Sequence, residues 1–391
     1  MLIRSIFILL CLLVLNCSQA QNHKLPQQTT SVGSAILPAA EAQFGTLVER
    51  IKTKRVALVA NQSSMVNQNH LVDTLWRVGV DIKRVFAPEH GFRGTHSAGE
   101  KVEHAIDSKT GLELVSLYGE NKKPKPEQLK DVDVLVFDIQ DVGLRFYTYI
   151  STLHYVMEAC AEHQIKLIVL DRPNPNAHYI DGPMLKKNYQ SFVGMHPVPV
   201  VYGMTIGEYA QMINGENWLK DGIQCELEVL MCEHYTHQKI YTLPVKPSPN
   251  LPNDQSINLY PSLCFFEGTS VSIGRGTPFP FQVFGHPEWR SDFSFTPTKN
   301  EGAKYPKHEH TVCYGFDLRS EPRLNQLHLT WLIDAYNKSK APFFNEFFNT
   351  LAGNSDLQEK IKEGKSDHEI RASWKSDLEA FKKTRANYLI Y

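Results

Sequence analysis

Two acidic residues directly follow apolar runs of strand length, and this placement makes them candidates for acid–base chemistry. Glu89 follows the run at residues 82–87, and Asp138 follows the run at 132–137. Two carboxyl groups that face each other across a pocket suit the hydrolysis of a glycosidic bond. One protonates the leaving oxygen, and the other activates water or attacks the sugar. Glu89 and Asp138 are therefore our candidate catalytic pair.

Further polar side chains follow four of the predicted strands. Because the carboxyl ends of parallel strands meet at one edge of a sheet, we expect these side chains to surround a common binding site. A single charged strand end is often only a helix cap, but four coincident polar ends indicate a site. The candidate binding residues of these segments are Asn61, His90, Arg93, Gln140, Asp141, Arg145, Tyr147, Arg172 and Asn174.

The candidate residues have both functional and structural interpretations. Arginine side chains present planar donor forks that match a carboxylate, so Arg93 and Arg145 are expected to bind an anionic substituent together with His90. Tyr147 offers a face for stacking on a sugar. On the structural side, Asp141 can cap a helix and Arg172 can pair with the preceding Asp171. The sequence leaves these alternatives open.

The elements that would position these residues follow an alternating pattern. Continuous apolar runs at 56–60, 82–87, 132–137 and 167–170 alternate with helical patterns at 71–78, 148–164 and 205–219, and a later strand is expected at 225–231. Uninterrupted apolar strands between helices are typical of a parallel sheet that helices cover on both faces. The sequence therefore predicts a doubly wound α/β domain.

A change in composition predicts where this domain ends. Five prolines fall within residues 244–261, and clustered prolines break regular structure. We place the N-terminal catalytic domain at 41–245 and a smaller α+β domain at 246–391, with helices expected near 328–338 and 355–362. Residues 21–40, rich in Gln, Thr, Ser and Ala, are predicted to form a flexible tether.

The first twenty residues resemble a secretory signal peptide. Arg4 precedes an apolar run at 6–15, and the small residues Ser18 and Ala20 stand at the positions that a signal peptidase reads. The protein is therefore expected to be exported to the periplasm or the extracellular space. Cys17 also permits a lipoprotein interpretation, although Asn16 is a poor residue before an acylated cysteine. No later run is long enough to predict a transmembrane helix.

Composition and missing motifs exclude several classes of function. The chain has 391 residues, of which 41 are basic and 42 acidic, so no basic surface for nucleic acid is expected. The sequence lacks G-x-G-x-x-G, G-x-x-x-x-G-K-[ST], G-x-S-x-G and H-E-x-x-H. We therefore predict no cofactor and no metal. The five cysteines beyond the signal peptide have no CxxC pair and are expected to be core residues.

Seven stretches of the sequence resemble the NamZ-type exo-β-N-acetylmuramidases of glycoside hydrolase family 171. They are FAPEHGFRG at 86–94, VFDIQDVG at 136–143, RFYTY at 145–149, LDRPNP at 170–175, PSPNLP at 247–252, FEGT at 266–269 and GRGT at 274–277. The resemblance extends from about residue 44 to residue 391. The sequence departs from the family pattern at two places: residues 177–178, where glycine is frequent, and Tyr202, where histidine is frequent.

The resemblance implies a Rossmann-like N-terminal domain, a smaller C-terminal domain that closes the cleft, and release of N-acetylmuramic acid from non-reducing ends of peptidoglycan fragments. The implied substrates are muropeptides or the MurNAc-GlcNAc disaccharide. Glu89 matches the glutamate that is proposed as catalytic in the family, whereas the role of Asp138 comes from its strand position alone. Glu267 and Arg275, in glycine-rich turns, are expected to bind substrate from the second domain.

The sugar itself fits the polar residues, and it leaves the mechanism open. N-acetylmuramic acid carries a lactyl carboxylate that an arginine can bind. Its acetamido group can act as an internal nucleophile, in which case Asp138 would orient the amide rather than attack. Two rival functions remain: a non-catalytic protein that binds cell-wall sugars in the same cleft, and a hydrolase of an ester or amide bond, for which the nucleophile motif is missing.

Overall fold

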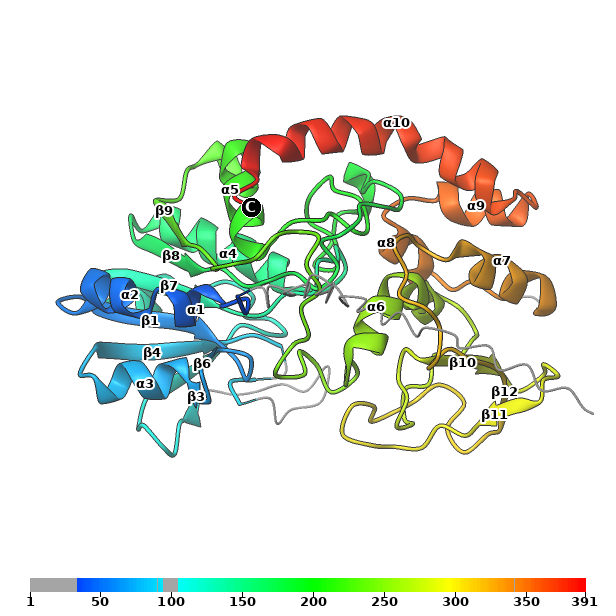
Figure 1. The fold of residues 1–391 in the computed structure, drawn as a ribbon, viewed down its shortest axis with the longest axis horizontal. Coiled ribbons are helices and arrows are strands. Elements are labelled where there is room, and N and C mark those ends of the chain that lie inside the picture. Colours follow the sequence, from blue (N-terminus) through cyan, green and yellow to red (C-terminus); the bar gives the residue numbers. More distant parts are fainter. Residues whose placement is uncertain (1–33, 90, 94–104, 341) are drawn as a thin grey trace, which may run out of the picture. The chain divides into compact units, whose positions relative to one another are not determined.

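A sheet of seven strands forms the centre of the N-terminal part of the chain (Figure 1). The computed structural model describes residues 34–89, 91–93, 105–340 and 342–391, so the predicted signal peptide and His90 lie outside the described residues. The strands of this sheet are β1 (Arg55–Ala60), β4 (Asp81–Ala87), β5 (Ala105–Ile106), β6 (Glu113–Ser116), β7 (Val134–Asp138), β8 (Lys166–Leu170) and β9 (Leu227–Leu230).

The order of the strands identifies the topology. In space they follow the order β5-β6-β4-β1-β7-β8-β9, and all neighbours are parallel except β5 and β6. Numbered along the chain, the six parallel strands have the order 3-2-1-4-5-6, which is that of the doubly wound Rossmann fold. The prediction of a Rossmann-like parallel sheet is confirmed. A small hairpin of β2 (Met65–Val66) and β3 (Asn69–His70) follows β1.

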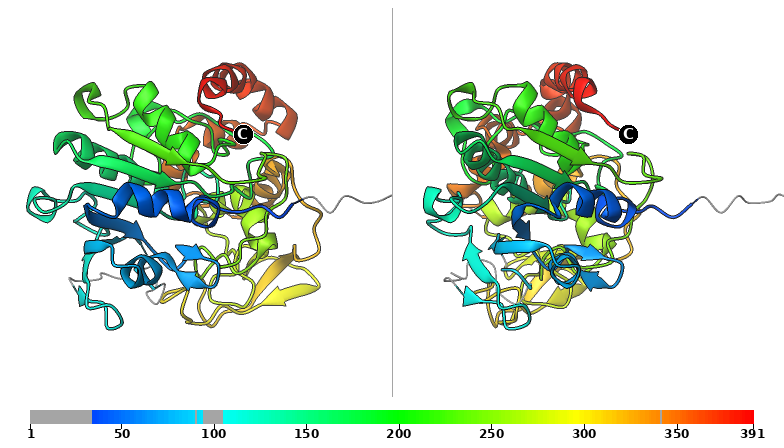
Figure 2. Two further views of the ribbon diagram at one scale, coloured as in Figure 1. Left: turned by 60° about the vertical axis from the view of Figure 1, so that its left-hand side comes forward. Right: turned by 90° about the vertical axis from the view of Figure 1, so that its left-hand side faces the viewer.

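Alternate residues of the central strands enter two separate apolar cores. Ala57 and Val59 of β1 pack in the core that contains α4 (Tyr149–Glu162) and α5 (Ile206–Gly215). Val56 and Leu58 of the same strand pack in the core on the other face. That core contains α1 (Ala39–Ala42), α2 (Phe44–Ile51) and α3 (Leu71–Arg77). Figure 2 shows these helices on opposite sides of the sheet. Burial on both faces explains why the strands are uninterrupted apolar runs.

The C-terminal part combines helices with a small antiparallel sheet. It begins with α6 (Asp254–Leu263) and a 3-10 helix, η4 (Cys264–Gly268), and its sheet has the order β10-β12-β11. These strands are β10 (Val283–His286), β11 (Phe293–Phe295) and β12 (Cys313–Asp317), and the helices that follow are α7 (Leu329–Lys338), α8 (Phe347–Ala352) and α9 (Asp356–Lys362). The prediction of a second, smaller α+β part is confirmed.

A long helix that the sequence analysis did not anticipate returns the chain to the first sheet. α10 (Asp367–Arg385) begins at the N-cap Ser366 and buries one face through Ile370 and Trp374. Beyond its end, the hydroxyl of Tyr391 donates to Asp171 Oδ2 at 2.8 Å, just after β8. Figure 1 shows the C-terminus beside α5 as a result.

Other details also differ from the sequence-based expectations. The tether predicted for 21–40 ends inside packed structure, because Leu37 pairs with Glu233 and Ala39 is fully buried. β5 and β6 were not predicted. The five cysteines in the described part are free and buried, as expected. None of the helices described combines the length and hydropathy that a membrane crossing needs.

A buried arginine joins the two parts of the fold. Arg145 follows β7 and is completely buried. Its Nη1 donates to the carbonyls of Pro183 and Val198 at 2.7 and 2.8 Å. Its Nη2 donates to those of Leu351 and Ala352 at 3.0 and 2.7 Å. The last two are carbonyls at the end of α8, which lack intrahelical partners.

The charge of Arg145 is held without a counter-ion. No carboxylate in the described ranges pairs with it, and burial lowers the pKa of Arg145 to about 9. Gly353 adopts a left-handed conformation beside it, with φ 77°, and a Cβ at that position would lie 2.7 Å from Arg145 Nη2. The guanidinium therefore fixes α8 against the segment that follows β7.

Replacing Arg145 with Met should lower the free energy of unfolding by about 3–5 kcal/mol, because several buried carbonyls lose their donor at once. Urea denaturation measures this change. Arg50→Met is the control, since Arg50 is largely exposed and its ion pair with Glu228 should contribute at most about 1 kcal/mol. Equal stability of the wild type and Arg145→Met would contradict the role given to Arg145.

Candidate active site

A cavity of about 240 Å³ is lined by residues of both parts of the chain. Some lining residues come from the segments that follow β4 and β7. Others come from the proline-rich connection, α6, η4, the turn after it and α8. Lining residues from these segments include Glu89, Tyr147, Tyr149, Asn250, Tyr260, Glu267, Arg275 and Phe347. The cavity thus brings together residues that are far apart in the sequence.

Glu89 is the carboxylate on the sheet side of this cavity. It lies two residues after the end of β4 and is half-buried. The hydroxyl of Thr148 donates to Glu89 Oε2 at 3.1 Å. Tyr118 lies close to Glu89, and burial together with this carboxylate raises the pKa of Tyr118 to about 12. The hydroxyl of Thr148 is the neutral donor that orients the carboxyl group.

Aromatic rings form much of the wall beside Glu89. Tyr147 and Tyr149 meet edge to face, with ring centroids 4.9 Å apart. The hydroxyl of Tyr147 donates to the carbonyl of Pro247 at 2.8 Å, and Asn61 donates to the hydroxyl of Tyr149 at 2.9 Å. Burial raises the pKa of Tyr149 above its ordinary value. These rings therefore present neutral faces and fixed polar atoms to a ligand.

An ion pair lies on the side of the cavity that the C-terminal part provides. Arg275 Nε and Glu267 Oε1 are 2.5 Å apart. Burial by itself would lower the pKa of Arg275, but the adjacent Glu267 outweighs burial and the pKa is raised. The guanidinium also lies over the ring of Phe281, 5.0 Å from its centroid. The structure thus brings the predicted residues Glu267 and Arg275 into the cavity that Glu89 lines.

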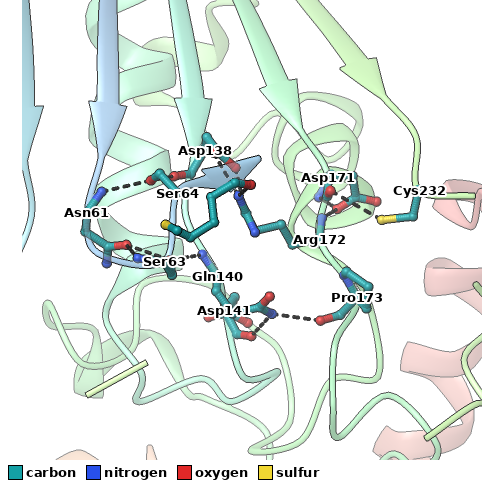
Figure 3. A network of polar contacts seen from close by, with 12 residues as sticks. Asn61, Ser63, Ser64, Asp138, Gln140, Asp141, Asp171, Arg172, Pro173 and Cys232 are labelled. Carbon is teal, nitrogen blue, oxygen red and sulfur yellow. Dashed lines mark hydrogen bonds and ion pairs between the residues drawn. The ribbon is translucent and has the colours of Figure 1, made fainter. Parts of the chain in front are cut away.

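Asp138 has a different environment from the one we expected. Its side chain is fully buried, and it does not line the cavity. Both carboxylate oxygens accept hydrogen bonds from Arg172, at 2.6 Å for Nε and 2.9 Å for Nη2 (Figure 3). This corrects the assignment of Asp138 as the second catalytic carboxylate. The correction extends to Arg172, whose guanidinium is engaged in this ion pair rather than in the cavity.

Three predicted binding residues make polar contacts within the strand-end loops, and Figure 3 shows two of them, Asn61 and Gln140. Gln140 donates to the carbonyls of Asp141 and Pro173, both at 2.7 Å. Asn174 donates to the carbonyl of Met204 at 2.8 Å. Asn61 accepts hydrogen bonds from the backbone and the hydroxyl of Ser63. These amides fix the loops at the strand ends, and only Asn61 reaches a cavity residue, through Tyr149.

Asp141 also lies in the interior. The hydroxyl of Tyr202 and the backbone of Gly143 donate to its Oδ2. Burial raises the pKa of Asp141 to about 6 even though both hydrogen bonds oppose this change. Tyr202, one of the two departures from the family pattern, is fully buried and contacts this carboxylate rather than the cavity.

Two of the residues expected to bind an anionic group, Arg93 and Arg145, do not line the cavity. Arg93 pairs with Asp73 at 3.0 Å and with Asp107 at 2.9 Å, and Arg145 is bound to carbonyls in the interior. His90 lies outside the described residues. Among the described residues that line the cavity, Arg275 is the one with a positively charged side chain.

Several cavity residues were not among the predicted binding residues. They are Thr148, Ser248, Asn250, Tyr260 and Phe347. Thr148 and Asn250 lie inside two of the motifs that carried the family resemblance, so those motifs contained a signal for them. Tyr260 and Phe347 lie in α6 and α8 and had no such signal. In the part of the chain that the structure describes, no group of three His, Cys, Asp or Glu residues could hold a metal ion.

Comparison with known proteins assigns both parts of the chain. Residues 56–255 match the family described as exo-β-N-acetylmuramidase NamZ, N-terminal, and residues 258–391 match its C-terminal counterpart. The chain belongs to the NamZ exo-β-N-acetylmuramidase family. These enzymes are glycosidases, so the cavity described above is a candidate glycosidase active site.

Individual relatives of the chain match nearly its whole length. The peptidoglycan β-N-acetylmuramidase NamZ of Bacillus subtilis (strain 168) is 38% identical, over 96% of this chain and 94% of that protein. A crystal structure of a DUF1343 family protein from Bacteroides fragilis NCTC 9343 is 45% identical, with a TM-score of 0.85, and covers 92% of this chain and 99% of that one. A second such protein from the same organism is 28% identical, with a TM-score of 0.80 over 91% of this chain and 99% of that one.

If the ion pair of Asp138 is structural, Asp138→Asn should lower the free energy of unfolding by about 3–5 kcal/mol, because it leaves a buried guanidinium without its counter-charge. The double variant Asp138→Leu/Arg172→Met should recover much of this loss, since it removes both charges. Thermal and urea denaturation measure the effect. An Asp138→Asn variant that loses turnover with unchanged stability would restore a catalytic role for Asp138.

Proposed function

We propose that this chain is an exported, exo-acting glycoside hydrolase that releases N-acetylmuramic acid from non-reducing ends of peptidoglycan fragments, with Glu89 as the general acid. The observation that carries the proposal is the position of Glu89 on a small cavity walled by tyrosines and a cation. Muropeptides and the MurNAc-GlcNAc disaccharide are the substrates we expect. The name of the relative from Bacillus subtilis supports peptidoglycan as the source of these fragments.

The size of the cavity supports attack on a terminal sugar. Its volume of about 240 Å³ is below the roughly 300–1,000 Å³ of pockets for drug-sized ligands. A single sugar unit matches this space better than a glycan strand does. Phe347 is a cavity residue with marked exposure, 42%, so we expect it at the opening, where the rest of the substrate would extend.

The position of Glu89 suits proton donation to the glycosidic oxygen. Thr148 holds the carboxyl group by a hydrogen bond to Oε2, and Tyr118 lies nearby. A general acid must lie within hydrogen-bond reach of the atom that it protonates. The sequence of the first twenty residues supports export, although these residues lie outside the described ones.

Arg275 accounts for the selection of N-acetylmuramic acid over sugars that lack a lactyl group. Its Nε is engaged with Glu267, and within the described ranges its two terminal nitrogens have no hydrogen-bond partner. A planar guanidinium edge matches a carboxylate in a bidentate manner. We therefore place the lactyl carboxylate against the terminal nitrogens of Arg275.

Glu89→Gln should reduce turnover of the MurNAc-GlcNAc disaccharide by about 10²–10⁴-fold, because the amide cannot donate a carboxyl proton. Release of N-acetylmuramic acid, followed by chromatography, measures this rate. Glu127→Gln is a control on an exposed carboxylate and should retain full activity. Full turnover by Glu89→Gln would contradict the acid role, and a wild type that binds the disaccharide without cleaving it would indicate a binding protein.

Arg275→Gln should weaken binding of N-acetylmuramic acid by roughly 10–100-fold, the loss expected for a hydrogen-bonded charge pair. Binding of N-acetylglucosamine should change little, since that sugar lacks the lactyl group. Isothermal titration calorimetry with both sugars measures the difference. Arg290→Gln, on an exposed arginine outside the cavity, should leave both affinities unchanged. An unchanged preference for N-acetylmuramic acid in Arg275→Gln would exclude this role.

A further inference from the structure

The cavity contains a second carboxylate whose chemical role differs from that of Glu89. Among the described lining residues, the carboxylates are Glu89 and Glu267. Most glycosidases use two carboxyl groups, one as acid and one as base or nucleophile. We propose that Glu267 accepts the proton of the attacking water while Glu89 protonates the leaving oxygen. This inference rests on the proposed function.

Glu267 lines the same cavity as Glu89 but belongs to the other part of the chain. Glu89 follows β4 of the large sheet, whereas Glu267 lies in η4, directly after α6. The two residues line one cavity, so a sugar bound there can contact an acid from each of the two segments. Asp138 and Asp141 cannot supply the second carboxylate, because both are buried and neither lines the cavity.

The turn that carries Glu267 is fixed by its packing. A Cβ on the adjacent Gly268 would lie 2.4 Å from the Cα of Phe348, so the close approach of η4 to α8 requires glycine here. The ammonium group of Lys307 donates to the carbonyls of Phe266 and Val271, at 3.2 and 3.1 Å, and also to that of Thr269. The backbone on both sides of Glu267 is therefore held in place before substrate arrives.

Arg275 orients the carboxylate and leaves one oxygen open. Its Nε binds Glu267 Oε1 at 2.5 Å, and Glu267 Oε2 has no hydrogen-bond partner in the described part of the chain. The side chain of Glu267 retains 24% exposure, so that oxygen can meet a water molecule in the cavity. Such preorganisation positions the reacting groups before reaction.

The proposed step is balanced in atoms and charge. The water oxygen forms a bond to the anomeric carbon while the bond from that carbon to the aglycone oxygen breaks. Glu89 transfers its proton to the aglycone oxygen, and Glu267 takes a proton from the water. The products are N-acetylmuramic acid and the aglycone alcohol. Transfer of one proton from Glu267 to Glu89 through solvent restores both groups.

Two substrates and added azide separate the two roles. 4-Nitrophenolate leaves without protonation, so Glu89→Ala should lose much more activity on the disaccharide than on 4-nitrophenyl N-acetyl-β-muramide. Glu267→Ala should lose about 10²–10⁴-fold on both substrates. Sodium azide needs no deprotonation, so it should restore nitrophenol release by Glu267→Ala and form N-acetylmuramyl azide, which mass spectrometry detects.

Matched controls make each outcome decisive. Glu288→Ala, on an exposed carboxylate outside the cavity, should match the wild type with and without azide. Glu267→Gln preserves the size of the side chain, and retained binding of N-acetylmuramic acid shows that the fold is intact. Wild-type rates in Glu267→Gln, or loss of activity in Glu267→Ala without azide rescue, would overturn the inference. If the wild type cleaves neither substrate, the proposed function fails instead.

Discussion

The cavity depends on one buried charge. Arg145 donates to two carbonyls near the sheet and to two at the end of α8, so it fixes the helix that carries Phe347 and Leu351 against the segment that carries Tyr147. Removing a guanidinium from water is costly, and only the simultaneous hydrogen bonds offset that cost. Both parts of the chain must therefore be in place before this residue is satisfied, which couples their packing to the formation of the cavity.

Polar residues at the strand ends hold neighbouring loops of the sheet together. The ion pair of Asp138 with Arg172 and the amide contacts of Gln140 and Asn174 connect neighbouring loops of the sheet. In a Rossmann-like sheet the crevice between β1 and β7 commonly receives a ligand. Here the protein's own loops meet at that point, as the contact between Ser63 and Gln140 shows, and the cavity is displaced toward the end of β4.

The sequence predicted the fold better than the roles of individual polar residues. Alternation of apolar strands and helices depends on local periodicity, so β1, β4, β7 and β8 were placed within two residues. β6 was not predicted because its four residues include the charged Glu113. α10 was not predicted because its apolar residues form only a narrow stripe on a mostly polar helix. The sequence brought Glu89, Tyr147, Glu267 and Arg275 correctly to one cavity. The sequence could not distinguish these cavity residues from Asp138, Arg93 and Arg145, which have partners inside the protein. The same residue types occur at strand ends whether the side chain binds a ligand or a buried protein group.

The hydrogen bond from Tyr147 to Pro247 has a consequence for how substrate enters. Residues 244–252 connect the two parts of the chain and would be the natural hinge between them. Tyr147 and Gln62 both bind the carbonyl of Pro247, at 2.8 and 3.1 Å, which anchors this connection to the sheet. A clamshell movement of the two parts would therefore have to break the hydrogen bonds of Pro247 and of Arg145 at the same time.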